Sequence, residues 1–123
     1  MAESWLAPGE DIVGSWSVFL GDPGVSSAKI TGKLFVTNAN VHFEAGLSLK
    51  ENAASLIAQR IKPYEKLENH IAIPFAEIAG VQSVKKSFLT KALAVKLKSG
   101  AELEFQFGAA SPQKAAEAIA AKL

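Results

Sequence analysis

The sequence predicts a mainly β domain in which about seven antiparallel strands are followed by one C-terminal α-helix. Apolar and polar side chains alternate along most of the 123 residues, which is the period of a strand that buries one face. Turn-forming residues such as Gly21-Asp22-Pro23-Gly24 separate these stretches. The last stretch, 111–123, instead carries apolar residues at helical spacing. Together these features indicate a sheet that one helix completes.

The first strand is expected over residues 12–20. Ile12, Trp16, Val18 and Leu20 share one parity of this stretch, whereas serines occupy the other parity. A strand of this pattern turns its apolar side chains inward and its serines toward solvent. We therefore expect Trp16 to pack in the core rather than to stack on a ligand.

The next two strands, 29–37 and 41–45, are expected to form a hairpin. The short turn at Asn38 and Ala39 joins them, and a two-residue loop fixes the register of the pair. That register brings four apolar side chains to one face of the sheet. The opposed pairs are Val36 with Val41 and Leu34 with Phe43.

An extra helix is expected over residues 48–62, between the third and fourth strands. Ser48 and Glu51 have the spacing of a capping box, and Pro63 ends the pattern. The helix has two interpretations. We favour that it covers the barrel side over Phe35, the apolar residue on the outer parity of its strand. Alternatively, Phe35, Leu56 and Ile57 form a surface for a partner or a second copy.

Four further strands are expected after this insertion, and the last two form a hairpin. Their odd loop, Lys98-Ser99-Gly100, needs Gly100 in the left-handed conformation. Lys96 then faces Glu102, a charge pair that favours this register by a few tenths of a kcal/mol, roughly. The four strands are expected at 67–74, 78–86, 92–98 and 102–107.

The C-terminal helix is expected over residues 111–123. Ser111 suits the N-cap position and Pro112 the first helical position. Many of its residues are alanines, which let a helix lie close against a sheet or over the open end of a barrel. Its expected apolar face consists of Ala115, Ala116, Ile119, Ala120 and Leu123.

Short motifs in this order resemble the GRAM family, whose fold is a pleckstrin-homology-like barrel. The strand from Gly32 to Asn38, followed by Val41-His42-Phe43, is similar to the G-x-L-x-x-T-N segment of that family. The resemblance implies one GRAM domain over residues 1–123, with a barrel of about seven strands closed by a helix. The other matching segments are Pro8-Gly9-Glu10, Ile73-Pro74 with Ile78 and Val81, and Ser99-Gly100 with Glu104-Phe105.

Composition narrows the class of protein. The net charge is +1 and there is no cysteine. We therefore expect no nucleic-acid partner, and neither disulfides nor cysteine-ligated metal. The N-terminus does not read as a secretory signal, and no stretch approaches the ~20 apolar residues of a membrane span. The expected location is the cytoplasm, either free or peripherally bound at the inner face of the membrane.

Residues for catalysis do not gather in the sequence. His42 and His70 fall on outward parity in separate strands, so both are expected at the surface and away from any metal. The serines lack the G-x-S-x-G context of a nucleophile, and no pair of carboxylates suggests acid–base chemistry. We therefore expect a binding module, not an enzyme, with neither cofactor nor metal.

Two binding hypotheses remain open. The first is a scaffold that recognises a protein partner or itself. The alternative is peripheral binding to anionic lipid through the loop from Lys85 to Lys91. No acidic residue lies between Glu77 and Glu102, and lysines beside two apolar side chains suit an anionic membrane surface. The residues proposed for this contact are Lys85, Lys86, Phe88, Leu89 and Lys91.

Overall fold

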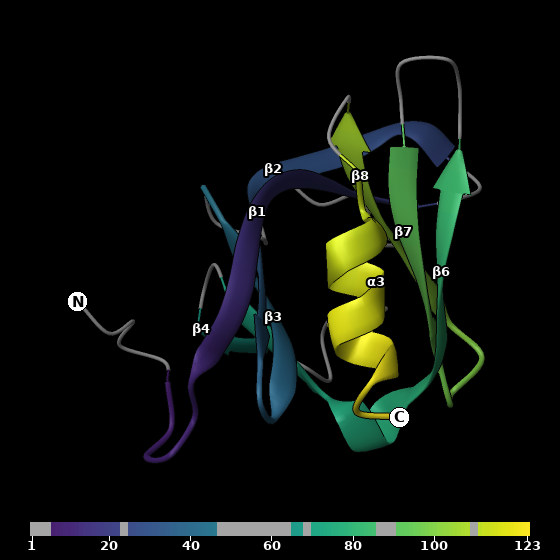
Figure 1. Cartoon of the computed structure of the whole chain (residues 1–123). Helices are drawn as coiled ribbons and strands as arrows, with labels where there is room; N and C mark the ends of the chain where they lie inside the picture. Colours follow the sequence, from purple (N-terminus) through teal and green to yellow (C-terminus); the bar gives the residue numbers. More distant parts are fainter. Residues whose placement is uncertain (1–5, 23–24, 47–64, 68–69, 86–90, 109–110) are drawn as a thin grey trace.

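The protein folds into one antiparallel sheet of eight strands and a C-terminal helix (Figure 1). This computed structural model describes residues 6–22, 25–46, 65–67, 70–85, 91–108 and 111–123. The predicted helix at 48–62 therefore lies outside the described residues. The elements are β1 (Ile12–Asp22), β2 (Val25–Thr37), β3 (Asn40–Ala45), β4 (Glu65–Leu67), β5 (His70–Pro74), the 3-10 turn η2 (Phe75–Glu77), β6 (Ile78–Lys85), β7 (Lys91–Leu97), β8 (Glu102–Gly108) and α3 (Gln113–Ala120).

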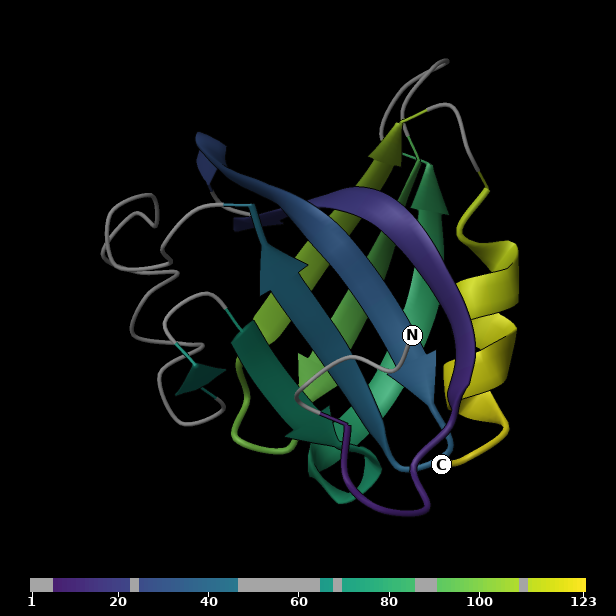
Figure 2. The ribbon, with the colours of Figure 1, turned by 90° about the vertical axis from the view of Figure 1, so that its left-hand side faces the viewer.

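The strands follow the order β4-β5-β3-β2-β1-β8-β7-β6. In Figure 2 the strands β1, β2, β3 and β5 cross in front of β6, β7 and β8. β1 joins the two groups, because it pairs with β2 over most of its length and with β8 over three residue pairs, from Phe19 to Gly21. We call this short β1–β8 pairing the seam. The predicted mainly β, antiparallel class is confirmed, although the expected strand 67–74 is divided into β4 and β5.

The β2–β3 hairpin has the predicted register. Val36 is paired with Val41 and Leu34 with Phe43, and all four side chains are buried. Gly32 lies further along the same pair, where a Cβ atom would come within 2.4 Å of the carbonyl oxygen of Glu44. Glycine is therefore required here because the two backbones approach closely.

The β7–β8 hairpin also has the predicted register. Val95 is paired with Leu103 and Lys96 with Glu102. Gly100 has a φ of 98°, and its N–H donates to the carbonyl oxygen of Leu97 at 2.9 Å. The left-handed residue thus closes the turn in the way that the odd loop length demands.

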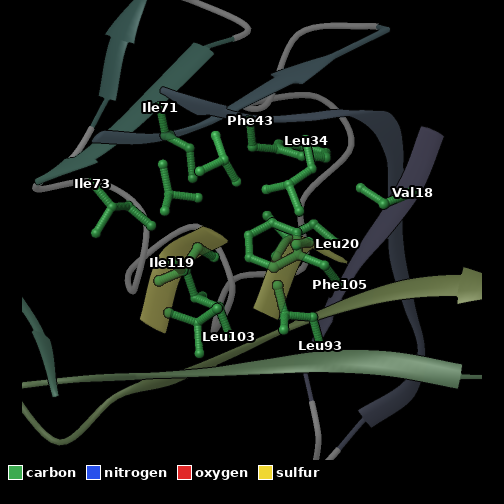
Figure 3. Close-up of a cluster of buried hydrophobic side chains, with 14 of the residues drawn as sticks. Val18, Leu20, Leu34, Phe43, Ile71, Ile73, Leu93, Leu103, Phe105 and Ile119 are labelled. Carbon is green, nitrogen blue, oxygen red and sulfur yellow. The ribbon is translucent and has the colours of Figure 1, made fainter. Parts of the chain in front are cut away.

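The core fills the space between the two groups of strands. Side chains from both groups meet there, and Ile119 of α3 joins them (Figure 3). Phe43 of β3 and Phe105 of β8 lie with ring centroids 5.8 Å apart, and both are fully buried. The inward parity predicted for the strands is therefore the parity that forms the core. The labelled core residues are Val18, Leu20, Leu34, Phe43, Ile71, Ile73, Leu93, Leu103, Phe105 and Ile119.

Helix α3 lies across the open side between the two groups of strands (Figures 1 and 2) and contacts both β6 and β2. The helix begins at Gln113 with Pro112 at the N-cap position, one residue later than predicted, and the hydroxyl of Ser111 accepts a hydrogen bond from the N–H of Gln113 at 3.2 Å. Ala115 and Ile119 are fully buried, but Leu123 is 53% exposed. The predicted end at Leu123 is wrong, because the helix ends at Ala120, and Ala120, which was predicted on the apolar face, is exposed.

Candidate functional site

A carboxylate, Glu10, is buried just ahead of β1 and accepts four hydrogen bonds. Its Oε2 accepts from the Thr37 hydroxyl at 2.5 Å, from Asn40 Nδ2 at 2.9 Å and from His42 Nε2 at 2.7 Å. Its Oε1 accepts from the N–H of Ala7 at 3.1 Å. The side chain is 3% exposed. A buried charge is tolerable only with such a set of partners.

The turn between β2 and β3 completes this site. Thr37 Oγ1 accepts the N–H groups of Ala39 and Asn40, at 3.1 and 2.9 Å. Asn38 accepts the N–H of Asp11 through Oδ1 at 2.9 Å and donates from Nδ2 to the carbonyl of Gly9 at 3.0 Å. The segment from Ala7 to Asp11 is thus held on the turn from Thr37 to Asn40. We call this arrangement the Glu10 clasp.

Two histidines extend the clasp across the sheet. His42 on β3 and His70 on β5 lie diagonally on neighbouring strands, since His42 is paired with Ala72 and Glu44 with His70. His42 Nδ1 and His70 Nε2 are 2.9 Å apart, and the ring centroids are 5.0 Å apart. Because His42 also contacts Glu10, the three side chains form a continuous chain, the Glu10–His42–His70 network.

The predicted surface position of the two histidines is wrong. His42 is 2% exposed and His70 is fully buried. Their outward parity was assigned correctly, but this face of β2, β3 and β5 is not open to solvent. Phe35, Thr37 and Ala72 on the same face are also buried. One signal was available in the sequence, because Phe35 is an apolar residue on that parity, directly opposite His42.

The surroundings of Glu10 act on its pKa in opposite directions. Burial alone would raise the pKa, but the hydrogen bonds from His42, Thr37, Asn40 and the Ala7 backbone outweigh burial and lower the pKa from 4.5 to about 2. Glu10 is therefore ionised throughout the physiological range. Sequence alone does not reveal this role, because the side-chain partners of Glu10 lie 27 to 32 positions away and leave no local pattern.

The network can exchange protons and hold strands together. Its rings are at most 2% exposed, so a substrate in solution does not reach them. The donor atoms also do not converge on one point, since His42 uses opposite ring nitrogens for its two partners. A metal needs ligand atoms that surround a single position. Accordingly, the described residues include no cluster of three or more carboxylates or histidines arranged for a metal ion.

The end of the β6–β7 hairpin places two lysines opposite one another. Lys85 and Lys91 are the last register pair before the loop, with Lys85 exposed and Lys91 half-buried. On its other side Lys91 is paired with Gly108 of β8, so neither cross-strand partner of Lys91 is acidic. The other residues predicted for this contact, Lys86, Phe88 and Leu89, lie outside the described residues.

The predicted partner surface is not supported at Phe35. Phe35 is only 5% exposed, so it offers almost no area to a partner. Leu56 and Ile57 lie outside the described residues. Trp16 packs against the core as predicted, with its ring centroid 6.2 Å from that of Phe107 and its ring against the backbone at Gly14.

Apolar side chains do reach the surface along β1. Val13 is 60% exposed, Phe19 43% and Ile12 39%. Val13 is the extra residue of a β-bulge, because Ile12 is paired with Thr37 and Gly14 with Val36. A bulge redirects the side chain of its extra residue.

Among the described residues, no helix is long and apolar enough to cross a membrane.

The fold is similar to that of a solved structure. This structure is the C-terminal domain of an unknown protein from Leishmania infantum, with a TM-score of 0.64. The match covers 94% of this chain and 85% of that one, at 18% sequence identity. At this identity the likeness concerns the fold alone. No protein-family model matches the sequence, and no curated protein matches it significantly.

Proposed function

We propose that this chain is a pleckstrin-homology-like domain of the GRAM type that binds anionic membrane surfaces peripherally, without catalysing a reaction. The observation that carries the proposal is the opposition of Lys85 and Lys91 at the end of the β6–β7 hairpin. Like charges directly opposite each other on neighbouring strands are unfavourable. An anionic surface relieves that repulsion, and neither register partner of Lys91 is acidic.

The expected strength of this contact follows from its charge. Each lysine close to an anionic bilayer contributes about 1 kcal/mol. Lys85, Lys86 and Lys91 together would contribute about 3 kcal/mol, which is roughly a hundredfold in partitioning. Phe88 and Leu89, between these lysines in sequence, would add apolar contact in the interface. The resulting affinity is that of a reversible, salt-sensitive membrane contact.

A catalytic role receives no support from the buried network. In this network His42 bonds to Glu10 through one ring nitrogen and to His70 through the other, inside the protein. A general acid or base has to come within hydrogen-bond reach of its substrate. We therefore assign these side chains a role within the fold.

Vesicle sedimentation tests the membrane proposal. Wild type should sediment with vesicles of phosphatidylcholine and phosphatidylserine, but not with phosphatidylcholine alone, and high salt should release it. Lys85→Glu with Lys91→Glu should abolish sedimentation. The matched control, Lys114→Glu with Lys122→Glu, changes the net charge equally at exposed positions on and just beyond α3. Equal binding by both double variants would refute the proposal.

A second candidate function is self-association, which the exposed apolar residues of β1 favour. Val13 and Ile12 present side chains that are 60% and 39% exposed at the bulge. Buried against a second copy, they would gain the transfer energy that they lack in the monomer. Light scattering after size-exclusion chromatography should then show a dimer, and Ile12→Ser with Val13→Ser should give a monomer. A monomeric wild type at all concentrations would exclude this candidate.

A further inference from the structure

The geometry of the Glu10–His42–His70 network determines where its protons lie. Glu10 Oε2 faces donors from Asn40 Nδ2 and His42 Nε2. It also faces the hydroxyl of Thr37, whose oxygen already accepts two backbone N–H groups. An oxygen surrounded by three donors acts only as an acceptor, as an ionised carboxylate does. His42 therefore carries its hydrogen on Nε2.

The position of the next hydrogen follows from the first. A neutral imidazole has one N–H and one bare nitrogen, so neutral His42 accepts through Nδ1. The nitrogen facing it at 2.9 Å, His70 Nε2, must then donate. Both histidines are thus in the Nε2–H form when the pair carries no charge, and each hydrogen points toward Glu10 along the chain.

One additional proton fits into this arrangement. It enters at His70 Nδ1, and the hydrogen on His70 Nε2 can shift across the 2.9 Å contact to His42 Nδ1. The imidazolium then lies on His42, against the carboxylate of Glu10. One proton is gained, and the two hydrogen bonds of the network, Glu10 with His42 and His42 with His70, are kept. The charge ends beside the group that best stabilises it.

A second additional proton does not fit. Both facing nitrogens, His42 Nδ1 and His70 Nε2, would then carry hydrogen at a separation of 2.9 Å. Two cations would also lie with ring centroids 5.0 Å apart inside the protein, where charge is poorly screened. His42 keeps its partner in Glu10, so His70 is the residue that has to leave. It is the first residue of β5.

We propose that the His42–His70 pair is a one-proton site that joins β3 to β5 and releases β5 at His70 when a second proton arrives. Acidification through the range in which histidines titrate would then loosen the sheet on the side of β4 and β5. Stability on this side would be greatest while the folded pair holds a single added proton.

The charged groups around the pair fit a single added charge. Glu10 faces His42 from the segment ahead of β1, and Glu44 of β3 is the register partner of His70. Lys33 of β2 is opposite Glu44 on the other side. β4 has Leu67 as the register partner of His70 and carries Glu65 and Lys66 in its sequence. By their place on these elements, three carboxylates (Glu10, Glu44, Glu65) are set against two lysines, and this excess of one negative charge favours one imidazolium here.

Nitrogen NMR of the histidine rings in the wild-type protein tests the proposal directly. At alkaline pH both rings should give the signals of the Nε2–H form. On acidification the folded protein should take up one proton shared by the two rings, and the second should coincide with loss of native signals around His70. An Nδ1–H form of His42, or two imidazolium rings in an intact fold, would overturn it.

The pH dependence of folding gives a second measurement. Below about pH 6.5 the unfolded chain binds a proton on each histidine, whereas the folded protein binds one on the pair. As the pH is lowered in this range, the folding equilibrium constant of wild type should therefore decrease. For each pH unit, the factor of this decrease should be ten times larger than that of His70→Asn. Equal slopes would contradict the proposal. If His70→Asn does not fold, the NMR experiment on wild type still decides.

Discussion

At the scale of single residues, Glu10 shows how a buried charge can hold the segment ahead of β1 in place. Its carboxylate is bonded to three side chains from the β2–β3 hairpin and to one backbone N–H. Each charge-assisted bond is roughly twice as strong as a neutral one. Removing the charge weakens these bonds and adds an N–H or O–H to a side chain that is surrounded by donors, and a buried donor without an acceptor is costly for a folded protein.

We predict that Glu10→Gln lowers the free energy of unfolding by about 2–4 kcal/mol, since breaking one side of a buried, bonded charge pair has costs of that size. Urea unfolding measures it. Asp11→Asn is the matched control, because the side chain of Asp11 is exposed and its loss should change stability by less than about 0.5 kcal/mol. A similar loss in both variants would contradict the role given to the carboxylate.

The pKa of Glu10 predicts a separate acid effect. The folded-state pKa, about 2, lies below the reference value of 4.5, so the contribution to stability is complete above 4.5 and is lost as the pH falls toward 2. The shift corresponds to about 3 kcal/mol at most. Unfolding curves across this range should show the loss in wild type, and Glu10→Gln should lack it. The window lies below the one expected for the histidine pair.

At the scale of secondary-structure elements, the close approach of β2 and β3 at Gly32 predicts a sensitive position. A Cβ atom there would lie 2.4 Å from the carbonyl oxygen of Glu44 and 2.7 Å from the ring of Phe43. Because the backbone of β3 cannot shift without disturbing its hydrogen bonds, we expect Gly32→Ala to destabilise the protein by roughly 1–3 kcal/mol.

Gly80 of β6 is the matched control, since a Cβ atom there meets nothing within 4 Å. Gly80→Ala should be neutral or stabilise by up to about 1 kcal/mol, through reduced freedom of the unfolded chain. Thermal unfolding of the two variants compares them directly. An equal change in stability at both positions would mean that the close backbone contact at Gly32 is not the reason why this position requires glycine.

The hairpins were predictable because their information is local. The turn Asn38–Ala39 and the odd loop ending in Gly100 each fix one register by loop length, and both registers are confirmed. The Glu10 clasp was not predictable in the same way. Its partners come from a distant hairpin, and parity alone assigns a residue to a face without saying whether that face is covered.

At the scale of the whole molecule, α3 links the two groups of strands. Ile119 is fully buried among side chains of both groups (Figure 3). We predict that Ile119→Ala lowers the free energy of unfolding by about 2–4 kcal/mol, because the cavity opens in a closed core. Leu123→Ala should cost less than about 0.5 kcal/mol, as this residue is 53% exposed. Chemical denaturation measures both free energies of unfolding. Equal losses in the two variants would contradict the role of α3 in the core.

The mainly β class with a C-terminal helix could be derived from alternation and capping residues, but the buried outer face could not. Outward His42 and His70 had the parity of surface residues, yet they lie in a polar interior layer with Thr37 and Glu10. Whether a second layer covers a sheet depends on long-range packing, which no short window of sequence contains.

The seam has a mechanical consequence. The backbone hydrogen bonding between the two halves of the sheet passes through three residue pairs of β1 and β8. The β1–β2 and β7–β8 hairpins on either side are paired over greater lengths, so the seam is weaker than either hairpin under tension. Pulling the halves apart should separate β8 from β1 before either hairpin unzips. Amide hydrogens at Phe19 to Gly21 would then exchange with solvent through local openings that leave both halves of the sheet folded.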